Sequence, residues 1–83
     1  MVEPTNYELL GEAIVAQAGR DYIDVKKQIY LLGEDKKLLR ELGKIMKFFN
    51  SGYYKLLTKV DSQWLISKLD EEFEAWKKQE ELG

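Results

Sequence analysis

The sequence contains no cysteine and no histidine, and it has one proline among its 83 residues. The absence of cysteine excludes disulfide bonds and thiol nucleophiles. The absence of both residue types excludes the common structural zinc sites and every histidine-dependent catalytic triad. The carboxylate pairs Asp21/Asp24 and Glu71/Glu74 lack a third ligand, so they make poor metal sites. We therefore expect a protein that is not an enzyme and that carries no metal ion and no cofactor.

Long apolar runs are also absent. No stretch of 18 apolar residues occurs, so the sequence predicts no membrane-spanning helix. The first ten residues, MVEPTNYELL, have neither the basic start nor the apolar centre of a secretory signal. These absences make the cytoplasm the expected compartment, and we expect no membrane among the partners.

The composition is that of a folded protein, with 45% apolar and 34% charged residues. The length of the chain predicts a single domain over residues 1–83. The net charge of −2 is unevenly distributed. Residues 1–25 carry five acidic residues and one basic residue. Residues 26–59 carry three acidic and nine basic residues, and residues 60–83 carry seven acidic and three basic residues. The middle of the chain is therefore basic, and both flanks are acidic.

Apolar residues recur every three or four positions through most of the chain, which is the period of an amphipathic helix. Gly33, the turn Asn50-Ser51-Gly52 and the potential N-cap Asp61 divide this pattern into segments. The sequence predicts an all-α fold, a small bundle of three main helices plus one short connecting helix. The main helices are expected at residues 6–32, 35–49 and 61–79, and the short helix at residues 52–57.

The apolar residues of the first predicted helix lie on one face of that helix. They are Tyr7, Gly11, Ile14, Val15, Ala18, Tyr22, Val25, Ile29 and Leu32. Gly11 and Ala18 are small, so we expect another helix to approach closely at these positions. The first helix is more than ten residues longer than the second. Part of its apolar face then has no partner within the chain unless the last helix covers it, and we therefore expect a homodimer.

Five of the ten aromatic residues lie between residues 48 and 66. They are Phe48, Phe49, Tyr53, Tyr54 and Trp64. Aromatic side chains bury large apolar areas and dominate the core energetics of small domains. We predict that these five residues form the centre of the core and that Trp64 closes the cluster.

Two segments resemble a known group of proteins. GEAIVAQAGRDY at residues 11–22 is similar to an "AIV-x-QA-x-x-DY" helix, and FFNSGYYKLLTKVDSQWLISKLDEE at residues 48–72 is similar to an "FF-x-S-x-aromatic-aromatic-x-x-LT-x-x-D" turn. Short, uncharacterised proteins of phages and integrative conjugative elements in Gram-positive bacteria share both motifs. The sequence departs from the second motif at Ser62, where glycine is expected. The resemblance implies a mobile-element context and brings no catalytic residue with it.

A row of basic residues on the second predicted helix and just beyond it is the sharpest candidate for a binding site. We call it the basic face, and it comprises Lys36, Lys37, Arg40, Lys44, Lys47, Lys55 and Lys59. Such a row suits binding to a phosphate backbone or to an acidic protein. It is equally explained as the solvent-exposed side that any amphipathic helix has. The low isoelectric point that the net charge implies argues against a nucleic-acid footprint.

These observations favour a non-enzymatic accessory protein of a phage or mobile element, which acts by protein-protein interaction with an unidentified partner. One alternative is a nucleic-acid-binding regulator that uses the basic face. The other alternative is a structural or assembly component.

Overall fold

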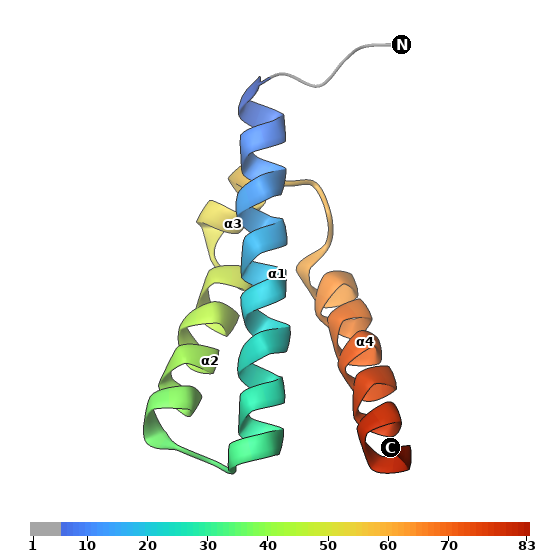
Figure 1. The fold of residues 1–83 in the computed structure, drawn as a ribbon. Coiled ribbons are helices and arrows are strands. Elements are labelled where there is room, and N and C mark those ends of the chain that lie inside the picture. The colour runs from blue at the N-terminus through green and yellow to red at the C-terminus, as the bar shows by residue number, and fades with distance from the viewer. Residues whose placement is uncertain (1–5) are drawn as a thin grey trace.

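A computed structural model describes residues 6–83 of the chain, and the side chains of residues 10–83. It contains four helices: α1 (Asn6–Leu32), α2 (Lys36–Phe49), α3 (Gly52–Leu57) and α4 (Ser62–Leu82) (Figure 1). The described residues form no strand, so the predicted all-α bundle of three main helices and one short helix is confirmed. α4 continues to Leu82, past the predicted end at residue 79. The helix continues past residue 79 because glutamine and glutamate are good helix formers.

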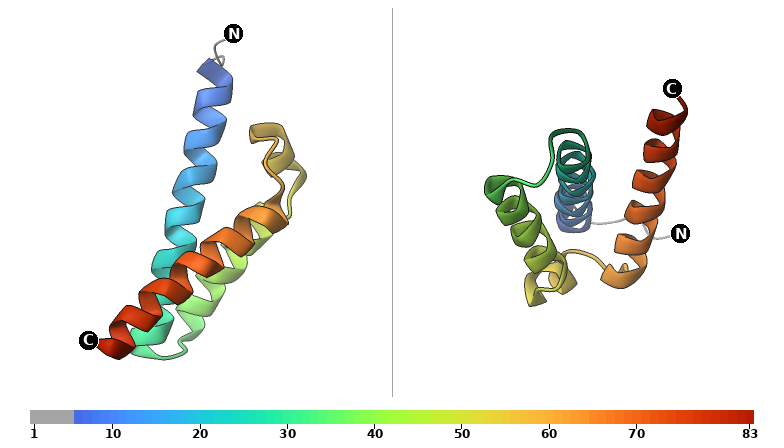
Figure 2. Two further views of the ribbon diagram at one scale, coloured as in Figure 1. Left: turned by 90° about the vertical axis from the view of Figure 1, so that its right-hand side faces the viewer. Right: turned by 90° about the horizontal axis from the view of Figure 1, so that it is seen from below.

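The long helix α1 lies between α2 and α4 and contacts all three other helices (Figure 2). α2 runs in the direction opposite to α1, whereas α4 runs in the same direction as α1. The short helix α3 lies beside the N-terminal half of α1, and the segment after it leads back to the start of α4. α2 and α4 therefore flank α1 instead of packing mainly on each other.

Local side-chain chemistry explains where the helices begin and end. α1 ends at Gly33, which adopts the left-handed φ of 89° that glycine tolerates best. At the start of α2 a carboxylate oxygen of Asp35 accepts a hydrogen bond from the backbone N–H of Lys37 at 2.7 Å. At the start of α3 the Ser51 hydroxyl accepts from the N–H of Tyr54 at 3.2 Å. Asp61 occupies the N-cap position of α4, but its side chain makes no capping hydrogen bond.

The core is centred on Phe49, which is 1% exposed. The Phe49 ring meets the edges of the Tyr22 and Tyr54 rings at centroid distances of 6.1 Å and 5.9 Å, and Phe48 lies 5.7 Å away. Edge-to-face pairs of this kind add to the stabilisation from burial alone. The Tyr54 hydroxyl donates to the backbone oxygen of Val60 at 2.9 Å and so holds the α3–α4 connection against the core.

The prediction that Trp64 closes this aromatic cluster is wrong, since its side chain is 54% exposed. α4 turns Ile66, Leu69 and Phe73 into the core. Two residues correspond to 200° around a helix, so Trp64 faces away from the core when Ile66 faces into it. Tyr53 is also half-exposed, although its ring still touches Phe48.

α3 covers the N-terminal part of the apolar face of α1. A Cβ atom built on Gly11 would lie 3.1 Å from the backbone Cα and C atoms of Leu57 and closer still to its carbonyl oxygen. The close approach expected at Gly11 is therefore present, and α3 supplies the partner. At the other end Leu32 is 77% exposed, contrary to its predicted place on the buried face, because the last turn of α1 extends beyond α2. α3 thus covers the apolar face at Gly11, whereas its Leu32 end is open, and Tyr7 lies outside the residues whose side chains are described.

A polar link joins α1 to α4. The Tyr22 hydroxyl and the Lys26 ammonium both donate hydrogen bonds to one carboxylate oxygen of Asp70, at 2.5 Å and 2.8 Å. Partial burial opposes the ionisation of Asp70, but the hydrogen bonds from Lys26 and Tyr22 and the charge of Lys26 outweigh it and lower the pKa of Asp70. Burial first, and then the hydrogen bond to Asp70 and its charge, raises the pKa of the Tyr22 hydroxyl. The link fixes the register of α4 along α1.

Candidate functional site

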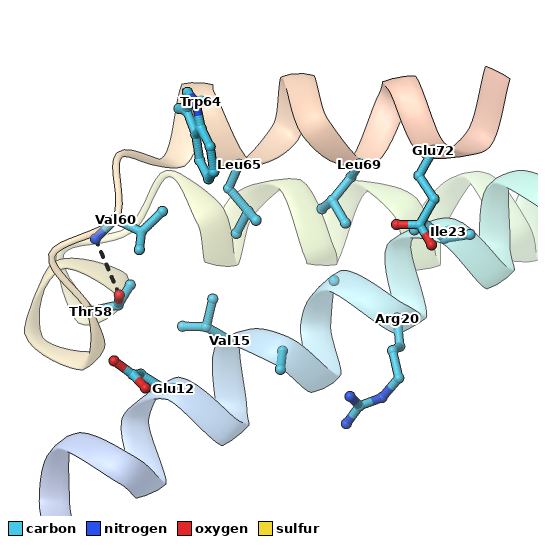
Figure 3. A pocket seen from close by; sticks show the side chains of 12 residues that line it. Glu12, Val15, Arg20, Ile23, Thr58, Val60, Trp64, Leu65, Leu69 and Glu72 are labelled. Atoms are coloured by element: carbon cyan, nitrogen blue, oxygen red, sulfur yellow. Dashed lines mark hydrogen bonds between the residues drawn. The ribbon is translucent and has the colours of Figure 1, made fainter. Parts of the chain in front are cut away.

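An open groove of about 340 Å³ lies between α1 and α4, and we call it the α1–α4 groove (Figure 3). α1 forms one wall, the first turns of α4 form the other, and the α3–α4 connection closes one end. Its lining residues are Glu12, Val15, Ala16, Gly19, Arg20, Ile23, Thr58, Val60, Trp64, Leu65, Leu69 and Glu72.

Small and branched apolar residues shape the floor of this groove. Val15 on α1 and Leu65 on α4 point toward one another across it. Gly19 lets Leu69 lie close to the backbone of α1, because the methyl carbons of Leu69 lie 3.4 and 3.7 Å from where a Cβ of Gly19 would be. Ala16, the next exposed position on the α1 wall, adds only a methyl group. The helices therefore leave a channel in which apolar surface meets solvent.

The end of the groove next to the α3–α4 connection carries two exposed apolar side chains. Trp64 is 54% exposed and Val60 is 42% exposed. The Lys68 ammonium lies 5.8 Å from the centre of the Trp64 indole, one helical turn further along α4. A half-exposed tryptophan beside an apolar channel is the kind of residue that anchors protein interfaces.

Charged residues stand at the rims of the groove. Glu12 and Arg20 project from the two ends of the α1 wall, and Glu72 projects from the α4 wall. All three are exposed, and Arg20 donates a hydrogen bond to the Gln17 side chain at 2.8 Å. Within residues 10–83 the ion pairs are Lys26–Asp70 and Lys68–Glu71, so none of the three rim charges is paired there.

The structure places the seven residues of the basic face in two groups. The five on α2, Lys36, Lys37, Arg40, Lys44 and Lys47, are all exposed. Lys55 on α3 and Lys59 after it are exposed too, and they surround a separate hollow that Glu12 also lines. No member of the basic face belongs to an ion pair of the described residues. The structure thus leaves these charges free for solvent or for an anionic partner.

Sequence reasoning found the basic face but missed the groove. The alanines and glycine of residues 13–19 do indicate a helix surface that another helix can approach closely. The position of Trp64 off the apolar stripe of α4 indicates an exposed ring. Neither signal shows which helix lies opposite, because the packing of α4 along α1 decides that.

No group of three or more acidic side chains within the described residues is arranged to hold a metal ion. In the same part of the chain, every helix is too short or too polar to cross a lipid bilayer. Comparison with protein-family models, with curated proteins and with solved structures found no match to this chain. The candidate site therefore rests on its geometry alone.

Proposed function

We propose that this chain is a non-enzymatic protein-interaction module that binds a helix of a partner protein along the α1–α4 groove. The resemblance of residues 11–22 and 48–72 to short proteins of phages and integrative conjugative elements supports its role as an accessory protein of a mobile element. Cytoplasmic location and action on a host or element-encoded protein belong to the same proposal.

The observation that carries this proposal is the half-exposed Trp64 at one end of an apolar channel bordered by charges. An amphipathic helix binds such a groove by placing its apolar face against the floor while its polar flanks meet the charged rims. Trp64 would lose most of its remaining contact with water in the complex, and buried tryptophans rank among the residues that contribute most to binding.

A photo-crosslinking experiment tests the proposal. A benzophenone amino acid replaces Ala16 in the groove in one variant and Ala75 in another, in cells that naturally contain the protein. Both alanines are exposed helix positions, and Ala75 lies outside the groove. We expect a protein adduct of defined mass from position 16 and none from position 75. No adduct from position 16, or equal adducts from both positions, would contradict the proposal.

The second candidate function is nucleic-acid binding by the basic face. The observation in its favour is that all seven side chains are exposed and unpaired among the described residues. Each phosphate that they neutralised would release a counterion and favour binding at low salt. We rank this function second because the acidic flanks of the chain give it a net charge of −2. The third candidate, a structural or assembly component, would use the same groove for contacts between chains.

A further inference from the structure

We infer that the occupant of the α1–α4 groove is α1 of a second copy of this chain, which packs antiparallel to the first α1 about a two-fold axis near Ala16. This inference rests on the proposed function of the groove and names its partner. It goes beyond the sequence-based expectation of a dimer, because it uses the exposed residues Glu12, Ala16 and Arg20 instead of the apolar face from which that expectation came.

The first argument is the spacing of the rim charges. Glu12 and Arg20 each lie four residues from Ala16, and four residues correspond to about 6 Å along the axis and about 40° around it. A two-fold axis at Ala16, perpendicular to the two antiparallel helices, reverses the displacement along the helix axis. It therefore places the partner's Arg20 at the level of Glu12, and Glu12 of the partner subunit at the level of Arg20, within reach of these long side chains. Both charges are exposed and lack an ion-pair partner within residues 10–83.

The second argument is the room at the crossing point. Ala16 lies on the axis, and it is exposed and carries only a methyl group. No large side chain of α1 separates the two helices at Ala16, so the axes can approach to about 10 Å, within the range for packed helices.

The third argument concerns what a different partner would need. Its helix would have to present a positive and a negative side chain eight residues apart on one face, with small residues between them and in the correct direction. The α1 helix of this chain already has that pattern in Glu12, Ala16 and Arg20. Self-association therefore satisfies both rim charges with no further assumption, and Trp64 and Val60 flank the incoming helix with apolar surface.

This arrangement is isologous, since the same surface is used by both copies. Isologous contacts close after two subunits and do not extend into filaments. The predicted assembly is therefore a dimer of twice 9.7 kDa.

Charge exchange between Glu12 and Arg20 gives a specific test by sedimentation at about 100 µM protein and low salt. We expect wild-type protein to be dimeric. Glu12→Arg and Arg20→Glu should each weaken dimerisation roughly tenfold or more, because each creates two like-charge contacts in place of two attractive ones. An equimolar mixture of the two variants should form a heterodimer, and the double variant should regain the homodimer. Glu74→Arg, an equal charge change on the exposed side of α4, should leave the dimer intact.

A cysteine substitution provides an independent readout. The chain has no cysteine, so Ala16→Cys introduces the only thiol. Because position 16 lies on the two-fold axis, its Cα atoms come within the range of about 4.4–6.8 Å in which disulfides form. We expect rapid formation of a disulfide-linked dimer from Ala16→Cys under mild oxidation and none from Ala75→Cys.

The outcomes separate this inference from the proposed function. Monomeric wild-type protein at several hundred micromolar, or no restoration in the mixture while circular dichroism shows folded variants, overturns the inference. If position 16 then crosslinks to a different protein, the groove still binds a partner and the proposed function stands. If position 16 crosslinks to nothing, both fail.

Discussion

Tyr22 and Asp70 lie 48 positions apart in the chain, and a 2.5 Å hydrogen bond joins their side chains. Lys26 donates to the same carboxylate oxygen, so one acidic side chain of α4 connects two positions on successive turns of α1. This polar contact joins α1 and α4 beside the core, and its strength depends on the charge of Asp70.

The first prediction concerns the stability of the protein at low pH. The pKa of Asp70 is lowered below its usual value of 3.8 in the folded protein. As the pH falls, the Asp70 carboxylate therefore becomes protonated in the unfolded chain before it does so in the folded protein. The contribution of Asp70 to stability is present above about pH 4 and is lost as the pH falls through the folded-state pKa. Asp70→Asn should lower the free energy of unfolding at pH 7 by about 0.2–1 kcal/mol, the range for partly exposed pairs, and should flatten its decline in acid.

Urea unfolding of wild type and Asp70→Asn at about pH 7 and about pH 3 measures this difference. Glu74→Gln serves as the control, since Glu74 lies one turn after Asp70 on α4, is exposed and belongs to no ion pair within residues 10–83. A gap between wild type and Asp70→Asn that stays constant or widens toward acid would show that the link does not depend on the Asp70 charge.

The second prediction concerns the core. Phe49→Ala should cost about 3–5 kcal/mol, because it removes a buried ring that contacts Tyr22 and Tyr54 and leaves a cavity. That loss is enough to unfold a domain of ordinary stability. Lys78→Ala, at an exposed position of α4, should change stability by less than about 0.5 kcal/mol. Chemical denaturation followed by circular dichroism compares the two variants, and similar small effects would place the core elsewhere.

The third prediction compares two helical glycines. Gly11→Ala should destabilise the protein by about 1–3 kcal/mol, because the added methyl group meets the backbone of Leu57, which cannot move without shifting α3. Gly43→Ala should stabilise it by about 0.5–1 kcal/mol, since nothing lies within 4 Å of the added atom and alanine favours the helix. Thermal melts of both variants check the opposite signs. If Gly11→Ala also raises the melting temperature, α3 does not lie against α1 as described.

The fourth prediction separates the two binding candidates. If the basic face bound duplex DNA through four to six phosphates, the logarithm of affinity would fall with the logarithm of salt at a slope of about −4 to −5. We expect no specific duplex binding at physiological salt. A gel shift at about 150 mM salt that is lost when Lys36, Arg40, Lys44 and Lys47 become glutamate would make DNA binding the leading function. The exposure of these four residues means that the charge reversal should leave the fold intact.

The features that sequence reasoning predicted correctly depend mainly on neighbours in the chain. The predicted breaks at Gly33 and Asn50-Ser51-Gly52 are present because Gly33 adopts a left-handed φ and the Ser51 hydroxyl accepts a hydrogen bond from the backbone N–H three positions later. Phe49 is buried because it ends the apolar stripe of α2 in an aromatic-rich segment. Such features follow from local spacing and residue type.

The features that it missed depend on how the helices are placed relative to one another. Trp64 has the composition of a core residue, but the direction in which α4 leaves the α3–α4 connection turns it outward. Leu32 continues the apolar period of α1 beyond the point at which any helix covers it. The α1–α4 groove combines residues up to 60 positions apart, from Glu12 to Glu72, so no local pattern reveals it.

The parallel direction of α1 and α4 has a consequence for folding during synthesis. A ribosome completes α1 at Leu32, but Phe73, one of the last core residues of α4, follows 41 residues later. At about 5–20 residues per second this takes about 2 to 8 seconds. Until Leu69 has been synthesised, Val15 and Ile23 of the nascent chain cannot pack against it. The parallel arrangement thus leaves one side of α1 without its partner helix until synthesis of the described residues is nearly complete.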